Sequence, residues 1–388
     1  MTGKSWQGDT VGPVTDLGPA GPGSPVSALI LAAGYSSRMA PAFKPVLPLN
    51  DTPMVCAVID LFYGAGVRDI VVVAGHNHGQ VKSAVKNTPA RVVVNSDYAL
   101  GMFSSIRTGA GEIDPESQGF FLLPVDIPAV RPSTLARIKA AFLKRPELPV
   151  VPCFNAKTGH PPLIPGPAIE SIMHAGSDNN LRDILFAKAY TCLAVHDQGI
   201  LMDADTPEGY EAVKEQFAKR LMPNRTECLS MIGAELSGEQ EIKAHLLLVE
   251  KTAMALYNAL LPALSGLNPD LVRAAALLHD IKRKVSRHDR AAEKFLLDMG
   301  FAELAAVVGA HMTLENPGEE PGEKEIVYFA DKVCAGACLD LDYESRFRRK
   351  ARDYPEARER IKQRLETARY IHARISAITG RSVKQILG

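Results

Sequence analysis

The sequence predicts an α/β domain with a mostly parallel sheet, followed by an all-α domain. Its 388 residues exceed the length of one typical domain, and each half is long enough to bury its own core. From Val26 to about Ala218, short apolar runs alternate with helical patterns, which is typical of a sheet covered by helices on both faces. After Gln240 the strand signals disappear and helical periodicity is sustained.

Composition divides the chain further. Residues 1–25 are rich in Gly, Pro, Ser and Thr and are expected to form a flexible tail. The α/β domain is expected over 26–220 and the all-α domain over 240–388. The polar stretch 221–239 contains Pro and Gly and predicts a linker.

The periodicity also predicts the individual elements. Strands are predicted at 27–32, 70–74, 91–95, 119–124, 150–152 and 190–195, and the helices between them include 54–65, 78–85, 104–110 and 132–142. Helices of the second domain are predicted at 245–261, 269–281, 290–299, 303–311, 325–339 and 356–378. The basic cluster within 346–350 is interpreted as a solvated helix face, because acidic residues follow it directly.

Charge and apolar content are those of an ordinary globular protein. The 44 basic and 44 acidic residues cancel, so no global field favours nucleic acid or a membrane as partner. No apolar run reaches the roughly 18 residues of a membrane span, and the N-terminus lacks a signal pattern. The six cysteines form no C-x-x-C pair and predict neither a zinc site nor a disulfide framework. We therefore expect a cytoplasmic protein with reduced thiols.

One loop is the strongest candidate for a binding site. The apolar run 26–33 ends at Gly34, and two serines, Arg38 and Lys44 follow. Backbone N–H groups, hydroxyls and two cations at the end of a buried strand suit the phosphates of a nucleoside triphosphate. The alternative is an ordinary strand–turn–helix whose basic residues face solvent.

Four further features are compatible with that loop. Asp126 ends the predicted strand 119–124, at the sheet edge where ligands of open α/β sheets bind. A glycine- and serine-containing loop spans 95–107, and a G-H-P turn follows later in the domain. Asp203 and Asp205 offer further carboxylates for Mg²⁺. Any one of these aspartates alone would more often cap a turn, so the set carries the argument.

Six motifs occur in the order typical of one family. They are L-A-A-G-Y-S-S-R-M with Lys44, V-V-V-A-G-H, N-S-D-Y-A-L-G-M-F-S-S-I-R, V-D-I-P, G-H-P and D-A-D-T-P-E. Over about residues 26–215, the chain resembles the nucleotidyltransferases related to molybdenum cofactor cytidylyltransferase. The resemblance implies a Rossmann-like fold, Mg²⁺, an NTP, and attack by a phosphorylated acceptor on the α-phosphorus with release of pyrophosphate.

The resemblance also implies roles for residues. Arg38 and Lys44 would stabilise charge on the phosphates, and Asp126 would hold Mg²⁺ together with Asp203 or Asp205. The nucleotide-binding set would be Leu31, Ala32, Ala33, Gly34, Ser36, Ser37, Arg38, Lys44, Asn95, Ser104 and Ser105.

The substrates implied are CTP and a molybdopterin-type acceptor. In this family, alanine at the position of Ala33 goes with cytidine nucleotides, and glycine there goes with guanosine nucleotides. Two departures from the family pattern weaken the substrate assignment. Ala40-Pro41 stand where glycine usually follows the Arg-Met pair, and Val125 stands where a small residue usually precedes the aspartate. Guanylyl transfer, or a sugar or polyol phosphate as acceptor, remains the alternative.

Histidines and aspartates recur on apolar helices of the second domain. The series is His245, His279, Asp280, His288, His311 and Asp331. A single histidine on an apolar helix is usually a satisfied core residue. A whole set would need as many separate buried partners, and a shared metal removes that requirement.

Over about residues 240–380, this series resembles the HD-type metal-dependent phosphohydrolase domain. Four of its members match the core metal ligands, and His288 and His311 match the extra ligands of members that bind two metals. Imidazole and carboxylate ligands suit Mn, Fe, Co or Ni. The alternative is a regulatory module that binds a nucleotide without hydrolysing it.

Overall fold

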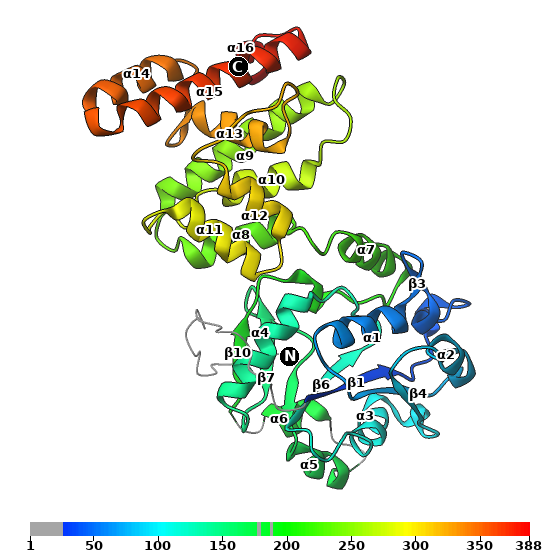
Figure 1. Ribbon diagram of the computed structural model, residues 1–388. Helices are drawn as coiled ribbons and strands as arrows, with labels where there is room; N and C mark the ends of the chain where they lie inside the picture. Colours follow the sequence, from blue (N-terminus) through cyan, green and yellow to red (C-terminus); the bar gives the residue numbers. More distant parts are fainter. Residues whose placement is uncertain (1–25, 177–179, 187–188) are drawn as a thin grey trace, which may run out of the picture. The chain divides into compact units, whose positions relative to one another are not determined.

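The structure is a computed structural model, and it describes residues 26–176, 180–186 and 189–388 (Figure 1). The chain divides into two compact units, with the boundary between Arg220 and Leu221. Each unit has its own hydrophobic core.

A mixed, mostly parallel sheet forms the centre of the first unit. Its order is β10-β7-β9-β6-β1-β4-β5, and β1 lies between β4 and β6, parallel to both. The strands are β1 (Val26–Ala32), β4 (Ile70–Ala74), β5 (Arg91–Val94), β6 (Gly119–Pro124), β7 (Val150–Phe154), β8 (Lys157–Thr158), β9 (Leu163–Pro165) and β10 (Thr191–Ala194), with β2 (Pro48–Leu49) and β3 (Thr52–Pro53) forming a separate hairpin.

Helices cover both faces of this sheet, as expected for strands that are apolar throughout. Along β1, Ile30 contributes to the core under α1, α4 and α7, whereas Leu29 contributes to the core under α3 and α5. The helices are α1 (Met54–Gly64), α2 (His78–Ala84), α3 (Met102–Ala110), α4 (Pro132–Lys144), α5 (Ala168–His174), α6 (Leu181–Phe186) and α7 (Pro207–Ala218). The predicted fold class is confirmed.

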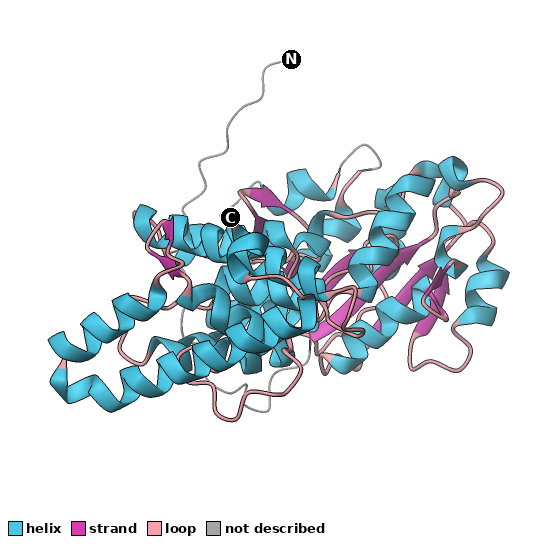
Figure 2. Ribbon diagram, turned by 90° about the horizontal axis from the view of Figure 1, so that it is seen from above, coloured by secondary structure: helices cyan, strands magenta, loops and turns pink. Residues whose placement is uncertain are grey.

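The second unit is helical except for one short hairpin (Figure 2). Its long helix α9 packs against α10, α13, α15 and α16. The helices are α8 (Arg225–Glu235), α9 (Gln240–Leu260), α10 (Pro269–Leu278), α11 (His288–Asp298), α12 (Ala302–Gly309), α13 (Glu323–Lys332), α14 (Tyr343–Asp353), α15 (Arg358–Thr379) and α16 (Val383–Leu387), and the hairpin is β11 (Cys334–Ala335) and β12 (Cys338–Leu339). No helix among the described residues is both long and apolar enough to cross a membrane.

Two expectations are corrected in this unit. Residues 221–239, expected to be a linker, contain helix α8, which Asn224 and Glu227 begin with a capping box. Cys228 and Met231 bury one side of α8 in the core of the second unit. The helix predicted over 325–339 ends at residue 332, and the β11–β12 hairpin takes its last third.

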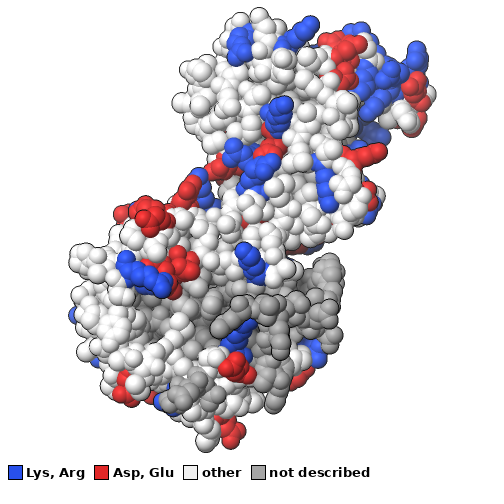
Figure 3. All heavy atoms as spheres, turned by 180° about the vertical axis from the view of Figure 1, so that it is seen from behind, with Lys and Arg blue, Asp and Glu red and all other residues white. Residues whose placement is uncertain are grey.

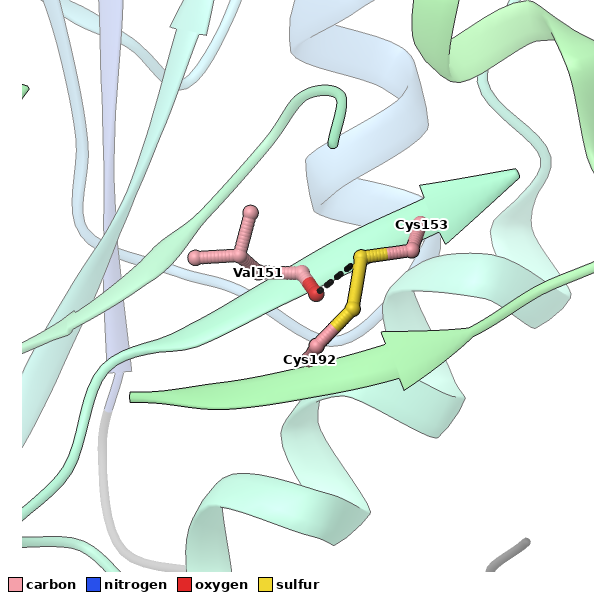
Figure 4. The surroundings of a disulfide bond; sticks show 3 residues. All are labelled: Val151, Cys153 and Cys192. Atoms are coloured by element: carbon pink, nitrogen blue, oxygen red, sulfur yellow. Dashed lines mark hydrogen bonds between the residues drawn. A yellow bond between two sulfur atoms is a disulfide. The ribbon is translucent and has the colours of Figure 1, made fainter. Parts of the chain in front are cut away.

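The cysteines give a third correction. Cys153 on β7 and Cys192 on β10 form a disulfide with an S–S distance of 2.10 Å (Figure 4). The two strands are parallel neighbours, which brings the Cα atoms of this pair to 6.2 Å. The expectation of reduced thiols therefore holds only for the other four cysteines, which are free.

Candidate functional site

The loop after β1 folds back on itself. Ser36 has a φ of +55°, and its hydroxyl oxygen accepts a hydrogen bond from the Lys44 backbone N–H at 3.1 Å. A 3₁₀ turn, Ser37–Met39, lies between them. This closure brings the Lys44 side chain back to the carboxyl end of the sheet.

Lys44 is the centre of an ionic cluster at that edge. Its Nζ lies 2.6 Å from Asp126 Oδ2 and 2.6 Å from Asp205 Oδ1. Arg38 adds a third contact, with Nη1 at 2.8 Å from Asp205 Oδ2. Burial disfavours the charged ammonium, but its hydrogen bonds to the two carboxylates outweigh burial and raise the pKa of Lys44. The same hydrogen bond from Lys44 lowers the pKa of Asp205.

Backbone hydrogen bonds join the later motifs to this cluster. The N–H of Ala204 donates to the Asp126 carbonyl at 2.9 Å, and the N–H of Asp205 donates to Asp203 Oδ1 at 3.2 Å. The G-H-P turn contains His160, whose pKa is lowered by burial and raised in part by the charge of Asp126. Three motifs that are far apart in the sequence therefore meet at one sheet edge.

Asn95, Ser104 and Ser105 form a buried network of their own. Asn95 Nδ2 lies 2.9 Å from Ser104 Oγ and 3.0 Å from Ser105 Oγ. The Asn95 amide oxygen accepts from the Asp97 N–H at 2.9 Å, and Ser104 Oγ donates to backbone carbonyls of the same loop. These side chains hold the loop between β5 and α3, and their contact with a nucleotide stays a prediction.

An aromatic cluster beside the loop was missed in the sequence. The Tyr35 ring lies 5.2 Å from the His76 ring and 5.2 Å from the Tyr98 ring, measured between centroids. Gly75 makes this approach possible, because a Cβ there would lie 2.7 Å from Tyr98 Cβ. Tyr35 remains 53% exposed, so its ring offers an aromatic surface at the edge of the loop. In the sequence, only the A-G-H motif with His76 and the S-D-Y motif with Tyr98 indicated this aromatic surface.

The second unit contains the other cluster. Five helices supply its members: His245 from α9, His279 and Asp280 at the end of α10, His288 at the start of α11, His311 just after α12, and Asp331 from α13.

Within this cluster, Asp280 belongs to two groups of ligand atoms. His245, His279 and Asp280 have ligand atoms within 4.8 Å of one another, and Asp280 does the same with His288 and His311. Asp280 Oδ1 lies 3.2 Å from His288 Nε2 and 3.4 Å from His311 Nε2. The opposite oxygen, Oδ2, lies 3.8 Å from His279 Nε2. Asp280 could therefore contribute one oxygen to each of two neighbouring ions.

Asp331 completes the first group. Its Oδ1 lies 3.1 Å from His245 Nε2 and 3.6 Å from His279 Nε2. Burial alone would raise the pKa of Asp331, but Lys332 and the neighbouring histidines outweigh it and lower this pKa well below its ordinary value. Asp331 is therefore an ionised carboxylate that faces His245 and His279.

Backbone carbonyls fix the orientation of three imidazoles. The Nδ1 atoms of His245, His279 and His311 lie 3.0, 2.9 and 2.7 Å from carbonyl oxygens of Gly336, Ala276 and Val308, respectively. A carbonyl only accepts hydrogen bonds, so Nδ1 carries a proton in each ring, and a neutral ring then has its lone pair on Nε2, the atom that faces the cluster.

Two of these Nε2 atoms have no partner. Within the described part of the chain, the buried Nε2 atoms of His279 and His311 form no hydrogen bond. Buried imidazole nitrogens that face inward without a hydrogen-bond partner, beside ionised carboxylates, are suited to bind a divalent transition metal. The residues present are therefore suited to hold one or two such ions.

The comparisons with known proteins assign each unit to a domain family. Residues 28–191 match the MobA-like NTP transferase domain, and residues 242–336 match the HD domain. The chain joins a MobA-like NTP transferase domain to an HD domain. It is accordingly an enzyme of the nucleotidyltransferase type.

Two curated relatives match the transferase half. Molybdenum cofactor cytidylyltransferase of Escherichia coli strain K12 is 24% identical over 197 residues, which is 50% of this chain and 99% of that relative. The bifunctional protein GlmU of Sorangium cellulosum is 30% identical over 133 residues, which is 33% of this chain and 28% of that relative. The chain thus spans little more than a quarter of that GlmU protein.

Solved structures give the same coverage. Rv0371c of Mycobacterium tuberculosis is 24% identical with a TM-score of 0.43, over 50% of this chain and 98% of that chain. A nucleotidyl transferase from a Methanothermobacter species is 24% identical with a TM-score of 0.44, over 51% of this chain and 99% of that chain.

Proposed function

We propose that the transferase domain is a Mg²⁺-dependent cytidylyltransferase that uses CTP and a molybdopterin-type acceptor and releases pyrophosphate. The observation that supports this most strongly is the cluster of Lys44 with Asp126 and Asp205 beside the loop after β1. The likeness to the Escherichia coli enzyme named molybdenum cofactor cytidylyltransferase supports the choice of acceptor.

In this mechanism, a phosphate oxygen of the acceptor attacks the α-phosphorus of CTP and pyrophosphate leaves. Arg38 and Lys44 neutralise the charge that develops on the phosphates, and the raised pKa of Lys44 keeps it cationic. Asp126, with Asp203 or Asp205, would hold Mg²⁺, which contributes further charge neutralisation when bound. The amides of the loop hold the β- and γ-phosphates.

The HD domain is proposed to be a metal-dependent phosphohydrolase. His245, His279, Asp280 and Asp331 would hold one ion, and His288 and His311 would join Asp280 around a second. Bound ions supply Lewis acidity for the attack of water on a phosphorus centre. The protein's contribution is to hold the histidine rings with Nε2 toward the ions and to keep Asp280 and Asp331 ionised.

Substrate profiling tests the transferase proposal. The full chain is incubated with CTP, GTP or ATP and molybdopterin, and the nucleotidylated product is measured by mass spectrometry. We expect product with CTP, formed about 10²–10³-fold more slowly by the Lys44→Ala variant. Product with GTP alone, or only with a sugar or polyol phosphate as acceptor, would contradict the assignment and favour the alternative.

Metal analysis tests the HD proposal. The full chain is expected to hold at least about one transition-metal ion, and the double variant His279→Ala/Asp280→Ala is expected to hold none. Phosphate release from a nucleotide panel then separates catalysis from regulation. A metal-loaded chain that binds nucleotides without releasing phosphate would identify the domain as a regulatory module.

A further inference from the structure

Three cations directly follow the histidine–aspartate pair at the end of α10, and they differ in the partners that they take. Lys282 and Lys284 pair with glutamates that belong to no candidate site. Figure 3 shows the same pattern on one face of the molecule, where lysine and arginine side chains lie beside acidic ones at several places. Arg283 instead contacts Asp280 and His288, two of the three residues in the second ligand group.

Arg283 occupies the ring nitrogen of His288 that lies toward Asp280. Its Nη1 lies 3.2 Å from His288 Nε2. A guanidinium only donates hydrogen bonds, so this contact uses the lone pair of Nε2. The Nε2 atoms of His279 and His311, in contrast, have no hydrogen-bond partner within the described part of the chain. Of these three imidazoles, that of His288 is the one whose candidate ligand atom already has a cation bound to it.

The same nitrogen of Arg283 also contacts Asp280. Nη1 lies 3.4 Å from Asp280 Oδ2 and 3.5 Å from Asp280 Oδ1. Oδ1 is the oxygen that approaches His288 and His311. A positive charge at this place attracts the carboxylate and repels a divalent cation that approaches the same atoms. Arg283 and an ion at the second ligand group would therefore compete for the same atoms.

The first ligand group is arranged differently around its own cation. Lys332 binds Asp331 through Oδ2 and leaves Oδ1 directed toward the two histidines of the group. Among the described residues, Arg283 reaches the first group only through Asp280, which both groups share. An ion at the first group would therefore meet less competition than an ion at the second.

The side chain of Arg283 is able to leave this position. It is 48% exposed, and its guanidinium has no partner besides Asp280 and His288 among the described residues. The backbone is held separately, since the N–H of Arg283 donates to the Asp280 carbonyl at 2.9 Å. Movement of the guanidinium away from the ligands thus costs its charge-assisted contacts and leaves the backbone in place.

We propose that Arg283 competes with the second ion of the HD site, so that the two ions bind in order. The proposal rests on the proposed function of the HD domain, in which these ligands bind metal. The first ligand group takes an ion readily. The second group, Asp280 with His288 and His311, takes one only after the guanidinium has moved aside, and therefore more weakly. The metal concentration then determines whether the site holds one ion or two.

Manganese titration of the full chain tests this order. Protein stripped of metal with a chelator is titrated with Mn²⁺ and followed by calorimetry and electron paramagnetic resonance. Two adjacent Mn²⁺ ions give an exchange-coupled spectrum, which an isolated ion at the transferase domain does not give. We expect the second ion to bind the parent about tenfold more weakly than the first, and Arg283→Ala to strengthen its binding by about tenfold. The affinity for the first ion is expected to change by less than about threefold.

Lys284→Ala is the matched control. Lys284 is the next residue in the chain, its side chain is 55% exposed, and its Nζ lies 2.9 Å from Glu239 Oε1. The variant therefore removes the same charge without touching the ligands, and both affinities are expected to match the parent. Equal strengthening in the two variants would overturn the proposal, because the general surface charge would then be the cause. An Arg283→Ala chain that binds the second ion like the parent, or a parent that binds both ions equally tightly, would also overturn it.

Other results identify a failure of the proposed function. If the His279→Ala/Asp280→Ala variant retains the metal content of the parent, the ligand set is wrong and the competition fails with it. If that variant loses its metal while Arg283→Ala behaves like the parent, only the competition is wrong. If the parent binds two ions in order but releases no phosphate from any nucleotide, the phosphohydrolase proposal fails and the competition stands.

Discussion

Lys332 and Asp331 are adjacent in the chain and also joined through their side chains, with Nζ 2.6 Å from Oδ2. The same ammonium donates to the His311 carbonyl at 3.0 Å. Lys332 therefore connects one residue from each of the two groups of the HD cluster. Because Oδ2 is occupied, only Oδ1 of Asp331 faces His245 and His279.

Replacing Lys332 with methionine is expected to destabilise the metal-free HD domain by about 3–5 kcal/mol, because the buried Asp331 carboxylate would lose the cation at its Oδ2. Added metal is expected to recover part of that loss. Thermal unfolding with EDTA and with Mn²⁺ measures both effects. Lys332→Arg is the conservative control. If the methionine variant loses the same stability with and without metal, Lys332 contributes only by packing.

Lys44→Ala is expected to lower the rate of nucleotidyl transfer by about 10²–10³-fold, because one fixed cation at the phosphates is lost. Lys214→Ala is the control, since Lys214 is an exposed residue of α7 with a surface ion pair of little energetic weight. Steady-state kinetics with each variant provide the comparison. Equal rates in the two variants would remove Lys44 from the catalytic machinery.

Asp69 predicts an acid-dependent contribution to the stability of the transferase domain. Burial raises its pKa, but hydrogen bonds from Arg91, Ser27 and the Asp114 N–H outweigh this and lower it. A lowered pKa stabilises the fold above the unfolded pKa of about 4 and loses that contribution as pH falls through the folded value.

Asp69→Asn is therefore expected to cost about 1–3 kcal/mol at pH 7, and the difference from the parent is expected to shrink below about pH 4. Thermal unfolding from pH 7 to pH 3 measures it. Asp51→Asn at an exposed turn is the control. If the stability difference between the parent and Asp69→Asn stays constant over this pH range, the charge of Asp69 does not contribute to stability.

Tyr35→Ala is expected to raise the KM for the nucleotide or the acceptor by about threefold to tenfold, with a smaller change in kcat, since a stacking surface is lost. Tyr35→Phe keeps the ring and is expected to keep the KM. Tyr63→Ala removes another exposed ring away from this cluster and serves as the control. An unchanged KM for both substrates in Tyr35→Ala would exclude stacking.

The sheet was predictable because β1, β4 and β6 are long, apolar runs bounded by turn residues. Strand β9 is only three residues long and antiparallel, too short for any periodicity to reveal. Helix α8 was not predicted because its sequence is polar, although Asn224 and Glu227 form a recognisable capping box.

The site residues were found as isolated motifs, but their contacts depend on tertiary structure. Lys44 meets Asp205 across 161 positions of sequence. The Cys153–Cys192 bond depends on β7 and β10 being neighbours, which a crossover topology decides. The hydrogen bonds that Lys332 donates to the His311 carbonyl and that His245 donates to the Gly336 carbonyl depend on how helices pack, which no local pattern encodes.

The six HD residues come from five helices, α9 to α13, which share one apolar core and a few polar contacts such as that of Arg273 with Glu250. An ion bound there would act as a cross-link between all five helices, comparable to the disulfides and structural metals that stabilise small domains. The resistance of this unit to unfolding would then rise with the free metal concentration. Metal supply, and not the sequence alone, would set how long the HD unit survives in a metal-poor environment.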